Sequence, residues 1–353
     1  MTLLHCNAVF SGLESIQKAV TIAAMVLDPD KRPTLRSLAE ITGLGVSTVS
    51  QALRDSPEIA EATRRRVQLA AQQAGYRPNR AGVRLRTGRT NVITVVLNPR
   101  EEGAGFFADF VYGIADGIAG SQYHLVVTPY SLSDPLEPIR YIVETQSADG
   151  VIFSRTQPDD TRVRYLMEHR IPFVSHGRTQ TDLQHPFYDY DNERYAFEAV
   201  AALKERNRKR IALLGPPPGL TYHLHTNKGF ERAIAQFRLD SLHLGSVNSE
   251  TPLDDIKSFA EHLSRQPHRP DGVVCSSASS AVALATAFAS AGLVIGRDFD
   301  VTSKSVSQLI RLTAPGLIYF AEDFRRAGYR LAQLLMKAIG GEDVRGLQDV
   351  AFV

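Results

Sequence analysis

Arginine and lysine side chains gather between Lys31 and Thr90, where they could neutralise phosphate groups. This stretch holds twelve Lys or Arg and four Asp or Glu, which is a net charge of +8. Because the whole 353-residue chain carries +2, the remainder carries −6. A compact basic segment on an otherwise acidic chain is typical of nucleic-acid binding. A basic helix face that is merely solvated would carry the same charge, so charge alone leaves both interpretations open.

Other residue patterns offer no catalytic or cofactor chemistry. Gly103-Ala104-Gly105 lacks the last glycine of a dinucleotide fingerprint, and the 215–219 segment Gly-Pro-Pro-Pro-Gly lacks the Lys-Ser/Thr of a P-loop. His223 and His225 have no third ligand nearby in sequence, so hydrogen bonding is favoured over a metal. The sequence also lacks a nucleophile elbow and a zincin helix motif. We therefore predict neither an enzyme, nor a metal site, nor a cofactor.

The composition is that of a folded protein with two to three domains of about 150 residues each. Hydrophobic residues make up 43% and charged residues 22% of the chain. Cys6 and Cys275 lie far apart, so no disulfide framework is expected. The apolar run 19–27 is too short to span a membrane and lacks the features of a secretory signal. We predict a cytoplasmic protein with no membrane association and an N-terminal extension, residues 1–31, of unknown role, with Met25 as an alternative start.

Three short helices are expected in the basic segment. Thr34 is a plausible N-cap for a helix that ends at Gly43, and a second helix begins at Val46 or Ser47. Two short helices joined by a glycine turn make a helix-turn-helix. A third helix follows Pro57, and its arginine run 64–66 is expected to face solvent or phosphate. Residues 77–90 hold five arginines and few apolar side chains, so they are predicted to form a linker.

From Asn91 onward, short apolar runs alternate with amphipathic helical patterns. The predicted strands are residues 92–97, 123–128, 150–153, 172–175, 210–214, 272–275 and 317–320. Apolar strands separated by helices indicate βαβ units and parallel sheets. Their number over about 260 residues favours two α/β lobes. Ligands of such folds bind at the carboxyl ends of the strands.

A specific pattern runs through Leu38-Ala39-Glu40, Gly43, Val46-Ser47-Thr48-Val49-Ser50, Ala52-Leu53, Thr63-Arg64, Val67, Ala70, Gly75-Tyr76-Arg77-Pro78-Asn79 and Leu85. This pattern resembles the DNA-binding headpiece of the lactose-repressor (LacI/GalR) family. The later strand–helix order looks like the family's effector core. It implies a small all-α helix-turn-helix headpiece plus an α/β two-lobed periplasmic-binding-protein-like core with parallel sheets. The implied bounds are 32–78 for the headpiece, 79–90 for the hinge and 91–353 for the core, with lobe one at about 91–190 plus 321–340 and lobe two at about 191–320.

The resemblance also implies which residues contact DNA. The second helix would lie in the major groove, with Val46, Ser47 and Gln51 at base edges and Thr48 and Ser50 at phosphates or in packing. The hinge would place Leu85 in a central minor-groove step. Asn79, Arg80 and Arg84 complete the predicted DNA-binding set. The sequence departs from the family's pattern at Gly45, where a Ser or Thr is common, and at Gln51, where an arginine is common. Glutamine favours contacts to adenine, whereas arginine favours guanine.

Family members grip a small ligand, often a sugar, between their lobes. The matching positions here are Asn98, Tyr130, Arg155, His176, Arg178, Tyr222, His225, Ser305 and Glu322. Thr226 stands where an arginine is common, which favours a neutral, hydroxyl-rich ligand. The 176–178 and 221–223 segments look similar to those of regulators of α-glucoside use.

The predicted function is therefore a homodimeric repressor of carbohydrate uptake or utilisation genes. Its partners would be a double-stranded DNA operator and a small sugar, which modulates operator affinity. Two alternatives remain: a secreted solute-binding protein, which would need a signal peptide and no basic headpiece, and a sugar-modifying α/β enzyme, which would need a catalytic constellation.

Overall fold

The computed structural model describes residues 32–77, 82, 84, 87–98, 106–130, 133–305 and 308–352. The chain separates into two compact units, with the division between Arg89 and Thr90. The predicted N-terminal extension and the predicted DNA contacts Asn79, Arg80 and Leu85 lie outside the described residues, and only the backbone of Ser305 is described.

The headpiece contains three helices, α2 (Leu35–Thr42), α3 (Val46–Ala52) and α4 (Glu61–Gln73). Thr34 caps α2, since its side chain accepts from the backbone N–H of Ser37 while the Ser37 hydroxyl accepts from the Thr34 N–H. Gly43 ends the helix with φ of 64°, a left-handed conformation that glycine adopts without strain. Buried apolar residues from all three helices form one core, which includes Leu38, Val49, Ala52 and Val67.

Lobe one is built on a six-stranded parallel sheet with the order β11-β5-β4-β3-β1-β2. Its strands are β1 (Val92–Leu97), β2 (His124–Pro129), β3 (Gly150–Phe153), β4 (Phe173–His176), β5 (Phe187–Tyr190) and β11 (Gln348–Ala351). Alternate residues of β1 point to opposite faces, so Ile93, Val95 and Leu97 share a core with α6 (Phe106–Ile118) and α14 (Phe324–Ile339). Val96 faces the other way, toward α7 (Glu137–Thr145) and α8 (Thr161–Glu168).

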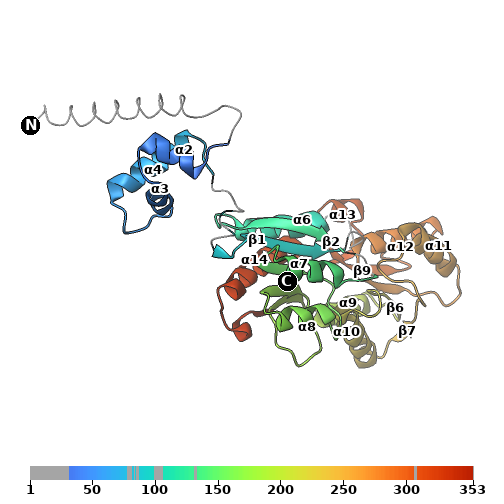
Figure 1. The fold of residues 1–353 in the computed structure, drawn as a ribbon. Coiled ribbons are helices and arrows are strands. Elements are labelled where there is room, and N and C mark those ends of the chain that lie inside the picture. Colours follow the sequence, from blue (N-terminus) through green and yellow to red (C-terminus); the bar gives the residue numbers. More distant parts are fainter. Residues whose placement is uncertain are drawn as a thin grey trace, which may run out of the picture. The chain divides into compact units, whose positions relative to one another are not determined.

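Lobe two is a five-stranded parallel sheet with the order β10-β9-β8-β6-β7. Its strands are β6 (Arg210–Leu214), β7 (Asp240–Leu242), β8 (Gly272–Cys275), β9 (Asp300–Ser305) and β10 (Ile318–Ala321). Its helices are α9 (Asn192–Glu205), α10 (Thr221–Phe237), α11 (Leu253–Ser264), α12 (Ala278–Ser290) and α13 (Gln308–Thr313). Figure 1 shows how the helices flank the two sheets of the core. The α/β fold with parallel sheets is as the sequence predicted.

Four strands were not predicted from the sequence, namely β5, β7, β9 and β11. β7 and β11 are short edge strands with exposed positions, so they lack a continuous apolar pattern. β9 is central yet polar, because Arg206 and Arg208 pair with the fully buried Asp300 at its start. Lobe one therefore extends past the predicted end at residue 340, through a short 3-10 turn, Val344–Gly346, into β11.

The first and last helices of lobe one, α6 and α14, cross at backbone contact. A Cβ atom on Gly113 would lie 2.0 Å from the carbonyl oxygen of Arg325, and one on Gly328 would lie 2.2 Å from that of Phe110. Glycine is required at both positions because any side chain would push the helices apart. The crossing joins segments that are more than 200 residues apart in sequence.

Candidate functional site

Helix α3 presents a neutral, exposed surface. Val46 is 44% exposed and Ser47 is exposed, whereas Val49 and Ala52 are fully buried in the headpiece core. Thr48, Ser50 and Gln51 are half-buried. Gly45 provides no side-chain cap at the start of the helix. The five residues predicted to meet DNA therefore lie on or beside the face of α3 that the headpiece leaves uncovered.

The arginines of the headpiece divide into structural and exposed ones. Arg64 donates to the carbonyls of Ser56 at 3.0 Å and Ile59 at 2.8 Å, and Arg66 donates to the Thr42 carbonyl at 3.0 Å. The expectation that the 64–66 run faces solvent or phosphate fits Arg65 and Arg66, which are exposed, whereas Arg64 is half-buried. The guanidinium groups of Arg64 and Arg66 satisfy carbonyls at turns and at the end of α2, which fixes how the helices pack.

In the core, polar side chains from both lobes meet where the strands end. We name the group His176, Arg178, Asp189, Tyr190, His225, Lys304 and Glu322 the interlobe site. Arg178, after β4, pairs with the buried Asp189 of β5 at 3.0 Å. Lys304, in β9 of lobe two, pairs with Glu322 at 3.1 Å. The Lys304 ammonium also lies 4.9 Å from the centre of the Tyr190 ring, so it links lobe two to β5 of lobe one.

Desolvation controls the protonation of this site. It lowers the pKa of His176 to about 4, with Lys304 adding to the effect, and that of His225 to about 4, with Arg178 adding to it. It raises the pKa of Asp189 to about 6, although Arg178 opposes the shift. Both imidazoles are therefore neutral near pH 7, and each can donate one hydrogen bond and accept another. The cations are matched by carboxylates, so the site has no large excess of either charge.

Several buried polar atoms at the strand ends have no hydrogen-bond partner among the residues that the structure describes. They are the Tyr190 hydroxyl, the Thr221 hydroxyl, Nδ1 of His225, the Ser276 hydroxyl and Nε of Arg155. Buried polar groups are normally paired, and each unpaired one has an energetic cost. Five such atoms at the carboxyl ends of β3, β5 and β8 and on α10 constitute unused hydrogen-bonding capacity of the kind a polyhydroxylated ligand requires.

The other predicted ligand residues have different surroundings. Arg155 forms a two-pronged ion pair with Glu250 of lobe two. Tyr130 is buried among the apolar side chains of lobe one, and Asn98 is buried at the end of β1. Tyr222 is half-buried on α10, and its carbonyl accepts from the Thr226 hydroxyl at 2.7 Å. Of the nine predicted positions, four are joined through Asp189 and Lys304 by ion pairs and electrostatic interactions, namely His176, Arg178, His225 and Glu322.

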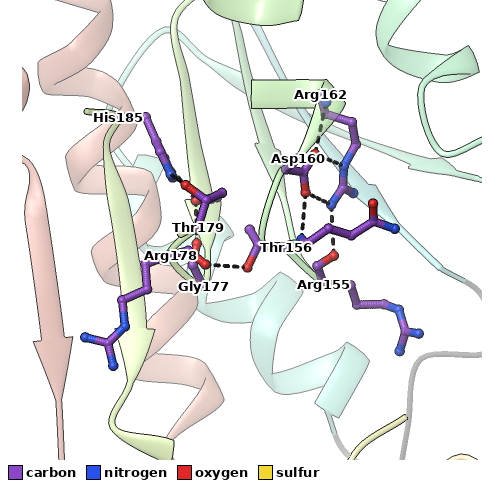
Figure 2. A network of polar contacts seen from close by, with 10 residues as sticks. Arg155, Thr156, Asp160, Arg162, Gly177, Arg178, Thr179 and His185 are labelled. Carbon is purple, nitrogen blue, oxygen red and sulfur yellow. Dashed lines mark hydrogen bonds and ion pairs between the residues drawn. The ribbon is translucent and has the colours of Figure 1, made fainter. Parts of the chain in front are cut away.

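A buried polar network supports the lobe-one side of this site (Figure 2). Asp160 and Arg162 pair at 2.7 Å with both side chains almost fully buried. Arg162 also donates to the Arg155 carbonyl at 2.9 Å, and the Thr156 hydroxyl donates to the Arg178 carbonyl at 3.0 Å. Figure 2 shows the guanidinium groups of Arg155 and Arg178 pointing away from this network. The loops after β3 and β4 are thus held together, while the side chains of Arg155 and Arg178 reach other partners, Glu250 and Asp189.

Sequence reasoning missed Asp189, Tyr190 and Glu250 as site residues. Asp189 and Tyr190 belong to β5, whose Phe-Tyr-Asp-Tyr sequence is too short and too polar for an apolar strand pattern. The alternation of aromatic and acidic residues directly before the helix start at Asp191-Asn192 is the signal that could have located them. Glu250 lies in a loop with no pattern that indicates its partner.

Comparison with known proteins agrees with both units. The family model for bacterial regulatory proteins of the lacI family matches residues 34–79, and a periplasmic binding protein-like domain matches residues 200–349. The transcriptional regulator AglR of Rhizobium meliloti is 32% identical over 86% of this chain and 87% of its own. CelR of Thermobifida fusca is 26% identical over 88% of this chain and 93% of its own.

Solved structures share the fold. The lac repressor dimer bound to operator and an anti-inducer has a TM-score of 0.76 at 17% identity, over 88% of this chain and 94% of its own. A CelR–cellobiose complex has a TM-score of 0.67 at 23% identity, over 90% of this chain and 97% of its own. In the part of the chain that the structure describes, no helix is long and apolar enough to cross a membrane. The chain therefore belongs to the LacI family and is a DNA-binding transcriptional regulator.

Proposed function

We propose that this regulator represses genes for carbohydrate uptake or use, and that a neutral α-glucoside bound at the interlobe site modulates its operator affinity. The unpaired buried polar atoms of the interlobe region carry the proposal, because hydroxyl groups of a sugar can satisfy donors and acceptors alike. The matching of Lys304 by Glu322 and of Arg178 by Asp189 argues against an anionic ligand. The cellobiose complex of CelR supports a sugar-responsive role.

Residues 32–78 act as the headpiece, 79–90 as the hinge and 91–353 as the effector core. Two headpieces of a homodimer read a pseudo-palindromic operator, with α3 in the major groove. Gln51 is suited to adenine and Val46 to a thymine methyl group. Leu85 enters a central minor-groove step, and the hinge arginines neutralise phosphates. The protein works on the chromosome in the cytoplasm by binding rather than by catalysis.

The experiment is selection of genomic DNA fragments by the purified full-length protein, followed by sequencing. The selection is repeated with maltose or sucrose, and with cellobiose as a β-linked control. We expect one palindromic site near sugar-transport genes that is lost with an α-linked sugar only. Enrichment that no sugar changes would contradict the effector part, and no enrichment at low salt would contradict DNA binding by the headpiece. Chromatography of the sugars after incubation with the protein would reveal any turnover, which we expect to be absent.

A further inference from the structure

A buried ion pair joins a loop of lobe one to a loop of lobe two. Arg155 follows β3 of lobe one, and Glu250 lies between β7 and α11 of lobe two. Both terminal nitrogens of Arg155 contact the Glu250 carboxylate, with Nη2 at 3.1 Å from Oε2. The side chains are only 8% and 18% exposed. Solvent and salt therefore screen this pair far less than a surface pair.

The lobe-one end of the pair is fixed by its own lobe. The Arg155 carbonyl accepts from Arg162, whose guanidinium is in turn held by the buried Asp160. Arg155 itself has φ of 58°, a left-handed conformation that residues other than glycine rarely adopt. The surrounding contacts thus keep an unfavourable backbone geometry that aims this side chain at lobe two.

The lobe-two end is equally anchored. The backbone N–H of Glu250 donates to the side chain of Asn248 at 2.9 Å, and that of Ser249 donates to the Gly215 carbonyl at 2.8 Å. The buried Ser280 hydroxyl donates to the Ser249 carbonyl at 3.1 Å. The backbone that carries each partner is therefore held in place by hydrogen bonds within its own lobe.

A backbone hydrogen bond next to the pair also joins the lobes. The N–H of Thr221, in the first turn of α10, donates to the Thr156 carbonyl at 2.8 Å. The first N–H groups of a helix have no acceptor within the helix, so this one depends on lobe one for its partner. Exchange of this amide hydrogen consequently reports on separation of the lobes near Arg155.

We propose that the Arg155–Glu250 pair is a latch that keeps the lobes together before any ligand binds. Arg155 is then a positioning residue that determines the lobe arrangement, rather than a group dedicated to gripping the ligand. The latch sets the fraction of protein molecules whose lobes already have the ligand-competent arrangement. It therefore sets the apparent ligand affinity of the interlobe site, a consequence that rests on the proposed function. The latch acts in the ligand-free protein, whichever sugar binds.

The test is hydrogen exchange of the full-length, ligand-free protein, measured by mass spectrometry with fragmentation to resolve Thr221. We expect Glu250→Gln to accelerate exchange of the Thr221 amide about tenfold, the scale of a typical coupling between two states. Amides in the centre of β1 should not change. The matched control is Asp349→Asn, which removes an ion pair with Arg330 inside lobe one and should leave Thr221 unchanged. Unchanged exchange in Glu250→Gln would overturn the proposal.

A second variant separates a latch from general loss of stability. Arg155→Gln should accelerate Thr221 exchange as much as Glu250→Gln, and the double variant should add nothing, because the two residues act as one unit. Additive effects, or acceleration throughout both sheets, would contradict a latch. Calorimetric titration with maltose then gives the consequence, a weaker affinity in both variants. Failure of maltose to bind the unmodified protein would count against the proposed effector alone, since the exchange result needs no ligand.

Discussion

Helix α3 and the interlobe site differ in the burial and charge of their polar side chains. The α3 residues predicted to contact DNA are uncharged and exposed or half-buried, while their neighbours Val49 and Ala52 belong to the headpiece core. The interlobe site instead buries charged pairs and leaves polar atoms unpaired between two sheets. In the headpiece, the residues proposed for recognition differ from those that stabilise the fold. In the core, the residues proposed for recognition are buried and also affect stability.

This difference follows from the ligands. A DNA groove brings its own hydrogen-bonding edges and phosphates to an exposed helix, so the protein does not have to desolvate its side chains in advance. A small molecule must be enclosed, so its partners are desolvated in the folded protein whether or not it is bound. Substitutions on α3 should therefore change DNA affinity with little change in the free energy of unfolding, whereas substitutions at the interlobe site should change both ligand affinity and the free energy of unfolding.

The largest effect is expected for Asp160→Ala in lobe one. It leaves Arg162 charged and almost fully buried without its carboxylate, which should lower the free energy of unfolding of the core by about 3–5 kcal/mol. Urea unfolding followed by circular dichroism measures it. The control is Asp159→Ala, whose exposed pair with Arg164 should contribute less than about 1 kcal/mol. Equal losses in both variants would remove the distinction between buried and exposed pairs.

Gln51→Ala should reduce specific operator binding by about 1–3 kcal/mol through loss of contacts to one base pair. Non-specific binding and the unfolding midpoint should stay nearly the same, because the headpiece core is built from apolar side chains of other residues. Fluorescence anisotropy on the selected operator and on a scrambled duplex measures the ratio. A drop in thermal stability, or an equal loss on both duplexes, would break the separation between recognition and stability.

Acidification should destabilise the core. The pKa values of His176 and His225 are about 4 when folded, so both histidines bind fewer protons than in the unfolded chain, and stability falls as pH drops from 6.5 toward 4. Asp189, with its pKa raised to about 6, acts in the opposite direction over the range from 6 to 3.8. The net loss between pH 7 and pH 5 should be about 1–2 kcal/mol, because solvent screens part of the contribution of the half-buried His225. Urea titrations at both pH values measure it.

Asp189→Asn provides the control for this pH dependence. The variant removes the opposing carboxyl group, so its stability should fall more steeply between pH 7 and pH 5 than that of the unmodified protein. A shallower dependence in the variant would mean that the two histidines are not the groups responsible.

The smallest effect is expected for Thr34→Ala at the start of α2. Loss of the capping box should lower the stability of the headpiece by about 1 kcal/mol, a typical value for an N-cap. Operator affinity at temperatures well below unfolding should remain unchanged, since Thr34 is not among the residues predicted to contact DNA. Thermal unfolding and anisotropy on the same sample test both statements. A large loss of affinity without unfolding would place α2 in the DNA interface.

Local signals explain what the sequence could predict. The Thr34 cap, the Gly43 stop and the apolar strands β1, β3, β6 and β8 depend on neighbouring residues, and all were predicted. The interlobe site was predicted only in part, because its pairs join residues far apart in the chain. Glu322 was predicted because it is a polar group that follows a predicted strand, whereas Asp189 in β5 becomes a site residue only through Arg178 and Lys304. No local pattern indicates that Glu250 meets Arg155.

The glycine-to-backbone crossing of α6 and α14 also has a consequence for how the protein is made. Lobe two runs from α9 to β10 without interruption, so a ribosome releases all of its strands before α14 emerges. Lobe one lacks both α14 and β11 until the last residues are synthesised. During translation the second lobe can thus complete its sheet first, while the first lobe waits with an exposed apolar face on β1 and β3. The lobe that begins earlier in the sequence is the one that finishes folding last.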